Sequence, residues 1–383
     1  MKVTVAIDSF KGSLSTFEAG EAIKEGVLRV FSDADVRISP LADGGEGTMD
    51  AIVSAAGGIV HTMPVCGPLG ERVRGYYGYI PKTETAVIEI SAAAGITLIP
   101  KEARDPMRTT TYGVGELIAD AIRKGCRKFI VGLGGSATND GGIGMLTSLG
   151  FEFLNADGAP VSLGGKGLAE LASIRTDGAL PQLSECEFLV ACDVKNPLCG
   201  ENGCSAIYGP QKGATPEVVG AMDAYLARYA ALTREVLPQS NADTEGAGAA
   251  GGLGFAFLSY LGAKLQSGVE LVTQQTGLEE LIKDADVVVT GEGRLDGQSY
   301  MGKAPIGVAR LAKKYGKPVV AFSGCVASGA GLCNEHGIDA FFPILRTPCT
   351  LEEAMDCDNA HSNLADTAEQ VFRLIGTWKA SEA

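Results

Sequence analysis

The feature that most constrains the fold is an alternation of apolar runs and helical segments at both ends of the chain. Residues 3–7 are typical of a buried strand and residues 16–31 of a helix, with Ser15 and Glu18 spaced as a capping box. Residues 286–315 hold a second strand and helix of the same kind. Because strand–helix alternation indicates a parallel sheet, we predict that both termini build one doubly wound, Rossmann/flavodoxin-like α/β domain.

The middle of the chain follows another pattern. Residues 72–80 and 85–90 predict two strands joined by a short turn, and therefore an antiparallel hairpin. Residues 216–236 predict a long helix, and residues 246–261 a Gly/Ala-rich helical segment. We infer a second, mixed α/β domain that is inserted into the first one, with the active site in the cleft between them. The first domain is expected at 1–65 plus 286–383, and the inserted domain at 66–285.

Charge and composition argue against several classes of function. The 383-residue chain carries a net charge of −14 and no run of Lys or Arg, so a nucleic-acid partner is not expected. Ten cysteines occur without a C-x-x-C pair and three histidines stand far apart, which argues against a disulfide framework, a zinc site or a Ser-His-Asp triad. With no signal peptide and no apolar run of membrane-spanning length, we expect a cytoplasmic protein without a membrane partner.

Five predicted strands are each followed by a glycine-rich polar cluster, and ligands collect at such strand ends in a parallel sheet. The first cluster is D-S-F-K-G-S-L-S. A capped helix start explains its last serine but not Lys11, Ser9 or Ser13, which suit a phosphate or a carboxylate. The second cluster is P-L-A-D-G-G-E-G-T. Its Asp43 and Glu46 either hold Mg²⁺ or a substrate hydroxyl, or only favour the helix N-terminus that follows.

The third cluster, G-L-G-G-S-A-T-N-D-G-G-I-G-M, follows the strand expected at 128–133. Six glycines are more than a purely structural loop needs, and the cluster predicts a nest of backbone amides for phosphate. Asp140 is a candidate metal ligand. The candidate phosphate contacts are Gly134, Gly135, Ser136, Thr138, Asn139 and Gly141.

The fourth cluster, A-C-D-V-K-N-P-L, is followed by G-P-Q-K-G-A at 209–214. Its Asp193 and Asn196 are similar, at looser spacing, to the Asp and Asn with which kinase loops hold a proton and a metal. Lys212 is a lone cation between glycines. Turn chemistry alone is the alternative explanation of this cluster.

The fifth cluster, T-G-E-G-R-L-D-G-Q-S-Y-M-G-K-A-P, follows the strand at 286–290. Its G-K is followed by alanine, so the hydroxyl that holds Mg²⁺ in a Walker A loop is missing. The charged residues remain candidates for binding an anion, a proton or a metal: Glu292, Arg294, Asp296 and Lys303. Several anion loops, several acids and no nucleophile–base pair together favour phosphoryl transfer.

In order and spacing, the five clusters resemble the motifs of the type I glycerate kinases, from residue 3 to about 375, as does G-A-G-A-A-G-G-L-G at 246–254. The resemblance implies a glycerate kinase that uses ATP and Mg²⁺ to phosphorylate D-glycerate in glyoxylate or sugar-acid catabolism. It implies two α/β domains of different topology. It favours 2-phosphoglycerate as the product and leaves 3-phosphoglycerate open, and monomer and homodimer both remain open.

Residue roles stay physical hypotheses. We expect ATP phosphates on the nest at 134–142 and the glycerate carboxylate at Arg294 or Lys11. Either Asp193 or Asp296 takes the proton from the attacking hydroxyl. The remaining candidates are Ser9, Ser13 and Asp43 for substrate, Lys212 and Lys303 for developing charge, and Asp140, Glu46, Glu292 and Asn196 for metal.

Three alternatives belong to other classes. G-L-G-G-S-A is similar to the phosphate loop of GHMP-type kinases, so a small-molecule kinase for a different hydroxy acid is the nearest one. A dinucleotide-dependent oxidoreductase would need G-x-G-x-x-G after a strand, whereas G-A-G-A-A-G at 246–251 follows a polar stretch. A sugar-acid sensor would explain the binding loops but not the several acids.

Overall fold

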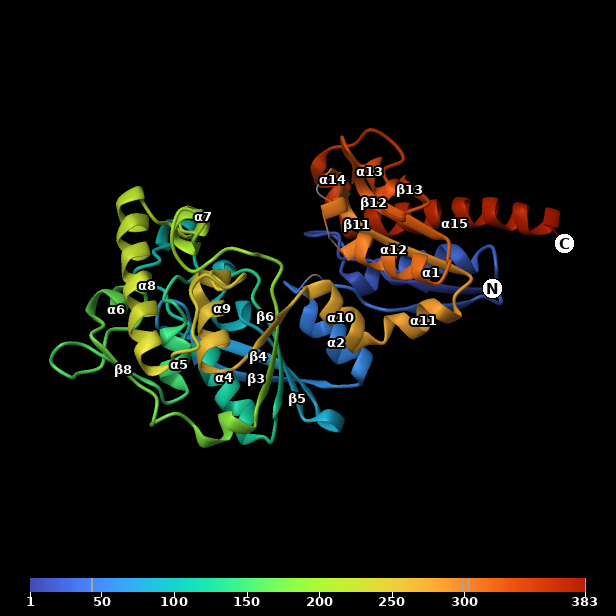
Figure 1. The fold of residues 1–383 in the computed structure, drawn as a ribbon. Coiled ribbons are helices and arrows are strands. Elements are labelled where there is room, and N and C mark those ends of the chain that lie inside the picture. Colours follow the sequence, from blue (N-terminus) through green and yellow to red (C-terminus); the bar gives the residue numbers. More distant parts are fainter. Residues whose placement is uncertain (43, 298, 302–303, 383) are drawn as a thin grey trace. The chain divides into compact units, whose positions relative to one another are not determined.

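The computed structural model describes residues 1–42, 44–297, 299–301 and 304–382, and its chain divides into two compact units (Figure 1). Unit 1 consists of Met1–Asp43 and Val269–Ala383, and unit 2 of Gly44–Gly268. The boundaries therefore fall earlier than the positions near 65 and 285 expected from the sequence. The first boundary is earlier because residues 44–66 supply a helix and an edge strand to unit 2. The second is earlier because Val269, Leu278 and Ile282 join an apolar cluster of unit 1.

Unit 1 is built on a five-stranded parallel sheet with the order β13-β12-β11-β1-β2. Its strands are β1 (Lys2–Val5), β2 (Asp35–Ile38), β11 (Val287–Leu295), β12 (Val319–Val326) and β13 (Ala340–Pro343). The chain leaves β1 toward β2 on one side and later returns to β11 on the other side, so the strand order reverses between β1 and β11. This doubly wound order confirms the α/β fold predicted for the termini.

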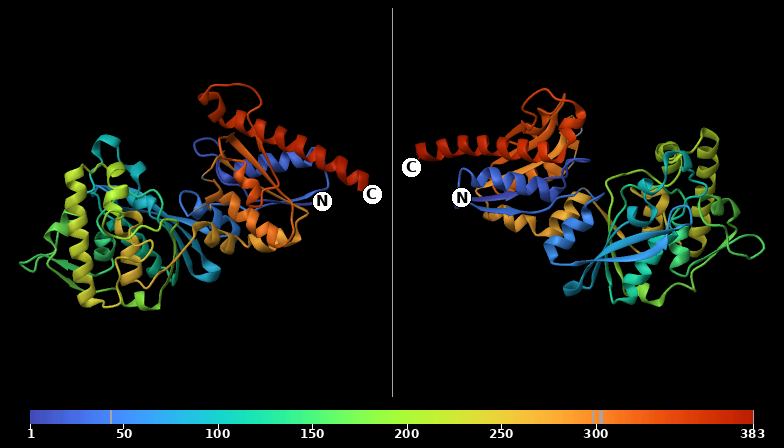
Figure 2. Two further views of the ribbon diagram at one scale, coloured as in Figure 1. Left: turned by 45° about the horizontal axis from the view of Figure 1, so that its top comes forward. Right: turned by 180° about the vertical axis from the view of Figure 1, so that it is seen from behind.

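Helices cover both faces of this sheet. Alternate side chains of β11 point to opposite faces: Val287 and Val289 join one apolar cluster, and Val288 joins the other. On the first face α1 (Thr16–Leu28) lies beside α15 (Cys357–Glu382), as both views of Figure 2 show. The other face packs against α10, α11, α12 and α13, and α14 follows β13. Their bounds are Gly268–Thr276, Leu278–Asp284, Ala304–Lys314, Leu332–Glu335 and Leu351–Met355.

The start of α1 shows the predicted capping box. The Ser15 hydroxyl accepts from the backbone N–H of Glu18 at 3.2 Å, and the Glu18 carboxylate accepts from the backbone N–H of Ser15 at 2.8 Å. Farther along the helix, a Cβ on Gly26 would lie 2.2 Å from the carbonyl oxygen of Ala365. Only glycine therefore lets α1 and α15 approach so closely.

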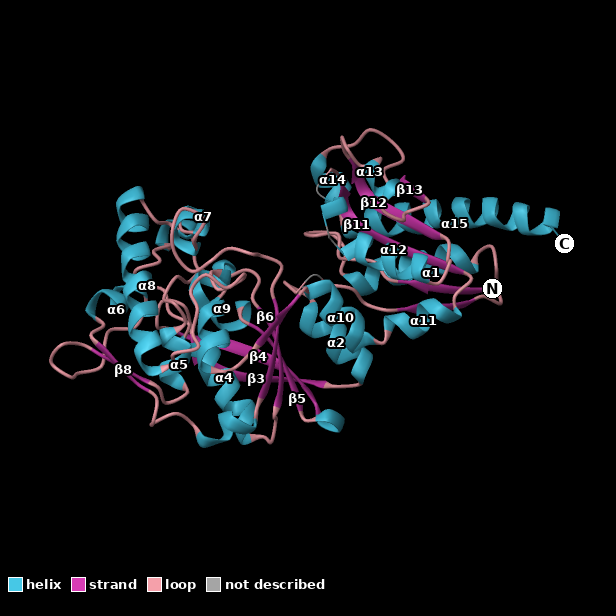
Figure 3. Cartoon of the chain, in the orientation of Figure 1, coloured by secondary structure: helices cyan, strands magenta, loops and turns pink. Residues whose placement is uncertain are grey.

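Unit 2 contains a six-stranded sheet with the order β10-β9-β6-β5-β4-β3 (Figure 3). Its strands are β3 (Ile59–Cys66), β4 (Arg72–Ile80), β5 (Thr85–Glu89), β6 (Lys128–Gly132), β9 (Glu187–Ala191) and β10 (Lys264–Gln266). β4 and β5 form the predicted antiparallel hairpin, whereas β5, β6, β9 and β10 are parallel. The edge strand β3 was not predicted. A separate pair, β7 (Glu152–Leu154) and β8 (Ser173–Arg175), is antiparallel.

The long helix of unit 2, α8 (Pro216–Val236), has the predicted bounds. The Gly/Ala-rich segment expected to be helical behaves differently: α9 (Ala249–Tyr260) begins with three left-handed residues, Ala250–Gly252. No helix in the described part of the chain is long and apolar enough to cross a membrane. The other helices are α2 (Thr48–Ala56), α3 (Ser91–Ala94), α4 (Tyr112–Arg123), α5 (Ile143–Ser148), α6 (Gly165–Glu170) and α7 (Cys204–Tyr208). Short 3-10 turns occupy Pro81–Thr83, Ile96–Leu98, Lys101–Ala103, Pro181–Glu185, Pro210–Lys212 and Ser299–Met301.

Candidate functional site

In unit 2, the carboxyl ends of three parallel strands meet at one edge of the sheet. Glu89 at the end of β5 pairs with Gly132 at the end of β6, which pairs with Ala191 at the end of β9. The glycine-rich loop that follows β6 therefore begins at the edge where ligands bind in parallel sheets. A Cβ on Gly134 would lie 2.7 Å from the Cα of Gly45, so the backbone of Gly45 packs directly against this loop.

Asp140 braces the glycine-rich loop from inside. Its buried carboxylate accepts from the backbone N–H and the hydroxyl of Thr111, at 2.8 and 2.9 Å. It also accepts from the backbone N–H groups of Gly142 and Gly144, at 3.1 and 3.3 Å. Because its oxygens are already used, the expectation that Asp140 holds a metal is not supported. Gly141 is likewise a packing position, since its N–H donates to the carbonyl oxygen of Gly251 at 3.0 Å.

Lys212 is a buried cation at the same loop. Its ammonium group donates to the Ser136 hydroxyl at 2.8 Å and to the Thr138 carbonyl oxygen at 2.6 Å. It forms no ion pair with any residue in the described ranges, and burial lowers the pKa of Lys212 to about 8. A desolvated cation without a counter-charge is costly, and a bound anion would supply that charge.

Two further polar atoms of this glycine-rich loop have no hydrogen-bond partner among the described residues. Within the part of the chain that the structure describes, the Thr138 hydroxyl and the Asn139 carbonyl Oδ1 are buried and make no hydrogen bond. The Asn139 amide Nδ2 is used, since it donates to the Ser205 hydroxyl at 2.8 Å. Gly134 is half-buried and Gly135 is exposed at the outer part of the loop. Unsatisfied buried polar groups in a loop with a buried cation indicate a binding site.

Glu89 is a candidate residue that the sequence analysis did not identify. It is 5% exposed, and its carboxylate accepts from the backbone N–H of Met49 at 2.8 Å. It thus caps α2, whose own N-cap residue, Gly47, has no side chain. Burial raises the pKa of Glu89 to about 7, and the nearby carboxylates of Asp50 and Glu46 add to the effect. Glu46 is exposed.

The two candidate residues in the loop after β9, Asp193 and Asn196, have different surroundings. Asp193 is exposed, and its carboxylate accepts from the backbone N–H of Gly268 at 3.1 Å. Asn196 has a structural role, because its Oδ1 accepts from the Tyr208 hydroxyl at 2.7 Å and its Nδ2 donates to the Asn202 carbonyl oxygen at 2.8 Å. The expectation that Asn196 is a metal ligand is therefore not supported.

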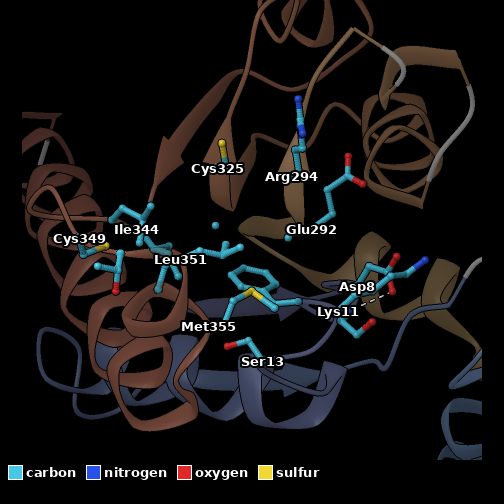
Figure 4. Close-up of a pocket in the computed structure, with 17 residues that line it drawn as sticks. Asp8, Lys11, Ser13, Glu292, Arg294, Cys325, Ile344, Cys349, Leu351 and Met355 are labelled. Atoms are coloured by element: carbon cyan, nitrogen blue, oxygen red, sulfur yellow. Dashed lines mark hydrogen bonds between the residues drawn. The ribbon is translucent and has the colours of Figure 1, made fainter.

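Unit 1 holds a cavity of about 660 Å³ at the carboxyl ends of its strands (Figure 4). Its polar wall is formed by the loop after β1 and by the end of β11, which contributes Glu292 and Arg294. Arg294 is exposed and lies 3.4 Å from the Asp296 carboxylate, whereas Glu292 is buried and accepts from the Ser299 hydroxyl at 2.5 Å. The residues of the first loop that line the cavity include Asp8, Ser9, Lys11 and Ser13.

The cavity thus brings together five of the predicted residues: Ser9, Lys11, Ser13, Glu292 and Arg294. The sequence analysis missed its apolar wall, to which Ile344, Leu345, Leu351, Ala354 and Met355 contribute. A capping box between Thr350 and Glu353 gives a local signal for a helix there, but nothing in the pattern indicates a binding surface. Two predicted residues, Asp43 and Lys303, lie outside the described residues.

Comparisons with known proteins place this geometry in a family. Residues 3–376 match the model of the glycerate kinase family. The chain is 46% identical to the glycerate kinase of Haemophilus influenzae, covering 98% of this chain and 99% of that protein. It is also 46% identical to the glycerate 2-kinase of Escherichia coli, covering 98% of each. A crystal structure assigned to glycerate kinase 2 from Salmonella typhimurium LT2 superposes with a TM-score of 0.91 at 46% identity, covering 99% of both chains. The chain therefore belongs to the glycerate kinase family and is an enzyme of the kinase class.

Proposed function

We propose that the enzyme transfers a phosphoryl group from ATP to D-glycerate and forms 2-phosphoglycerate. The observation that carries this proposal is the buried ammonium group of Lys212 in the glycine-rich loop of unit 2, which has no ion-pair partner among the described residues. The second anion site, with Lys11 and Arg294, lies in unit 1. In this reaction both substrates, ATP and glycerate, are anions, so one site serves the nucleotide and the other the acid. The name of the Escherichia coli relative supports the 2-hydroxyl as acceptor.

Catalysis in this proposal rests on positioning and charge. Lys212, and Lys303 outside the described residues, neutralise charge that develops during the transfer. Either Asp193 or Asp296 accepts the proton of the attacking hydroxyl. Lys11 and Arg294 hold an anionic group of a substrate, with Ser9 and Ser13 around it. Asp43, outside the described residues, stays a candidate for binding the substrate.

Mg²⁺ is proposed as the partner of the ATP phosphates. Carboxylate oxygens suit this ion, and Glu46 and Glu292 remain the candidates that would hold it. The described residues contain no cluster of three metal-ligating side chains. Mg²⁺ commonly keeps several water ligands and binds substrate phosphates, so one or two protein carboxylates are enough. When bound, the ion would neutralise phosphate charge.

The direct test is glycerate-dependent release of ADP by the purified full chain in the presence of ATP and Mg²⁺. Product NMR distinguishes 2-phosphoglycerate from 3-phosphoglycerate. No ADP release with D-glycerate would refute the proposal, and 3-phosphoglycerate would refute its regiochemistry. Asp193→Asn and Asp296→Asn identify the base, because the variant that lacks it loses turnover while substrate affinity persists.

A further inference from the structure

The cavity of unit 1 lies where the strand order of its sheet reverses. The loop after β1 contributes Asp8 and Lys11, and the end of β11 contributes Arg294, on the other side of the reversal. In open parallel sheets this reversal leaves a crevice at the carboxyl ends of the strands, and doubly wound folds bind nucleotides there. The position alone therefore favours a nucleotide over a small acid.

The walls of the cavity differ in chemistry. Figure 4 shows Lys11, Glu292 and Arg294 on the segments after β1 and on β11, and Leu351 and Met355 on the segment after β13. Leu351 is 80% exposed and Met355 is 36% exposed. Leu351 heads α14, which its capping box fixes in place, so its exposure is built into the fold.

Size and surface both exceed what glycerate can use. A volume of about 660 Å³ lies in the middle of the range of roughly 300–1,000 Å³ for sites of drug-sized ligands. Glycerate is a small acid with a hydroxyl on each of its other carbons. It therefore has no apolar surface that could cover Leu351 and Met355 and exclude water from them. A nucleotide has a flat base for an apolar wall and phosphates for cations.

We propose that this cavity binds the nucleoside part of ATP, with the base against Leu351 and Met355 and the phosphates toward Lys11 and Arg294. The inference rests on the proposed function and assigns its nucleotide to unit 1. It replaces the expectation that the loop at 134–142 cradles the ATP phosphates. The Lys212 site of unit 2 is then left to the acceptor acid and to the charge that develops as the phosphoryl group reaches it.

Calorimetric titration of the full chain with ADP and with inorganic tripolyphosphate tests the assignment. Leu351→Ser is expected to weaken ADP binding about tenfold, because one leucine no longer contributes its buried surface. Tripolyphosphate binding should stay at the wild-type level, since this ligand has no base. Leu374→Ser is the matched control, because Leu374 is another exposed leucine of unit 1 and does not line the cavity. Unchanged ADP affinity in Leu351→Ser, or an equal loss for tripolyphosphate, overturns the proposal.

Native thiols give a second readout that needs no substitution. Cys325 and Cys349 are exposed and line the cavity, whereas Cys186 lies in unit 2. ADP should slow alkylation of the first two and leave the third unchanged, as followed by mass spectrometry. Protection by D-glycerate alone, without protection by ADP, would assign the cavity to the acid instead.

The two proposals fail separately. If wild-type enzyme turns over D-glycerate but Leu351→Ser raises only the KM for glycerate, the nucleotide assignment is wrong and the kinase function stands. If ADP binding depends on Leu351 but no D-glycerate is phosphorylated, the assignment stands and the proposed reaction is wrong.

Discussion

Glu89→Gln should change how the stability of unit 2 depends on pH. Burial raises the pKa of Glu89 from 4.5 to about 7, with contributions from Asp50 and Glu46, and Tyr76 on β4 also faces it. Because the native pKa lies above the unfolded one, the native state keeps a proton that the unfolded state has released. Wild-type stability from this group is therefore present at low pH and is lost as pH rises through about 7.

The magnitude follows from the same values. At about 1.4 kcal/mol per pH unit, a rise from 4.5 to about 7 corresponds to roughly 3 kcal/mol over the whole window. Roughly 2.5 kcal/mol of this loss falls between pH 5 and pH 8. Glutamine does not ionise, and its carbonyl oxygen can still accept from the backbone N–H of Met49. The variant should therefore gain roughly that amount over wild type between pH 5 and pH 8.

Native-state thiol labelling of Cys126 measures this difference, because Cys126 is buried in the core of unit 2 and reacts only when the unit opens. Comparing variant and wild type at each pH cancels the ionisation of the thiol itself. Glu187→Gln, which changes an exposed acid of the same sheet, should leave the pH dependence unchanged. Parallel pH curves for wild type and Glu89→Gln would refute the reasoning.

Three further predictions follow from the glycine-rich loop of unit 2. Lys212→Met should lower kcat/KM by about 100-fold or more in the ADP-release assay, whereas Lys195→Met, at an exposed lysine, should not. Wild-type activity should also fall above pH 8 as Lys212 deprotonates, and activity that stays constant above pH 8 would exclude a role for this lysine. Asp140→Asn should reduce the free energy of unfolding by about 2–4 kcal/mol in urea, because buried donors lose their acceptor; a near-neutral result would contradict the bracing role. Gly251→Ala should reduce the free energy of unfolding by at least about 2 kcal/mol, since φ is +69° and the new Cβ would lie 2.0 Å from the carbonyl oxygen of Thr138. Gly316→Ala, at φ +65° with no atom near the new Cβ, should reduce it by only about 1 kcal/mol.

Much of the fold could be predicted from local sequence signals. The bounds of α8 and the capping box of α1 were predicted because spacing and capping chemistry act within a few residues. β3 was missed because this edge strand exposes Ile59 and Val60 and lacks the clean alternation of a half-buried strand. The Gly/Ala-rich start of α9 is left-handed because Gly251 packs onto Thr138, a contact distant in sequence.

Among the candidate site residues too, local sequence signals were informative, whereas roles that depend on contacts distant in sequence could not be predicted. Loop composition drew attention to Lys11 and Arg294, which line one cavity, and their role in binding stays a prediction. The bracing role of Asp140 depends on Thr111, far away along the chain, so no local pattern could separate a brace from a metal ligand. Glu89 is a single acid at a strand end, and its importance comes only from its burial and its contact with Met49.

Because unit 2 is inserted into unit 1, the two parts of unit 1 are synthesised at different times and its sheet can be completed only after unit 2 has been translated. β1 is an inner strand of the unit 1 sheet and pairs with β11, but all of Gly44–Gly268 is translated between them. At about 5–20 residues per second, the β1 edge waits roughly ten seconds or longer for this neighbour on a growing chain. Unit 2 can meanwhile fold as one continuous segment. A growing chain from which residues 1–268 have left the ribosome would therefore carry one complete unit and a strand, β1, that pairs with β2 but still lacks its neighbour β11.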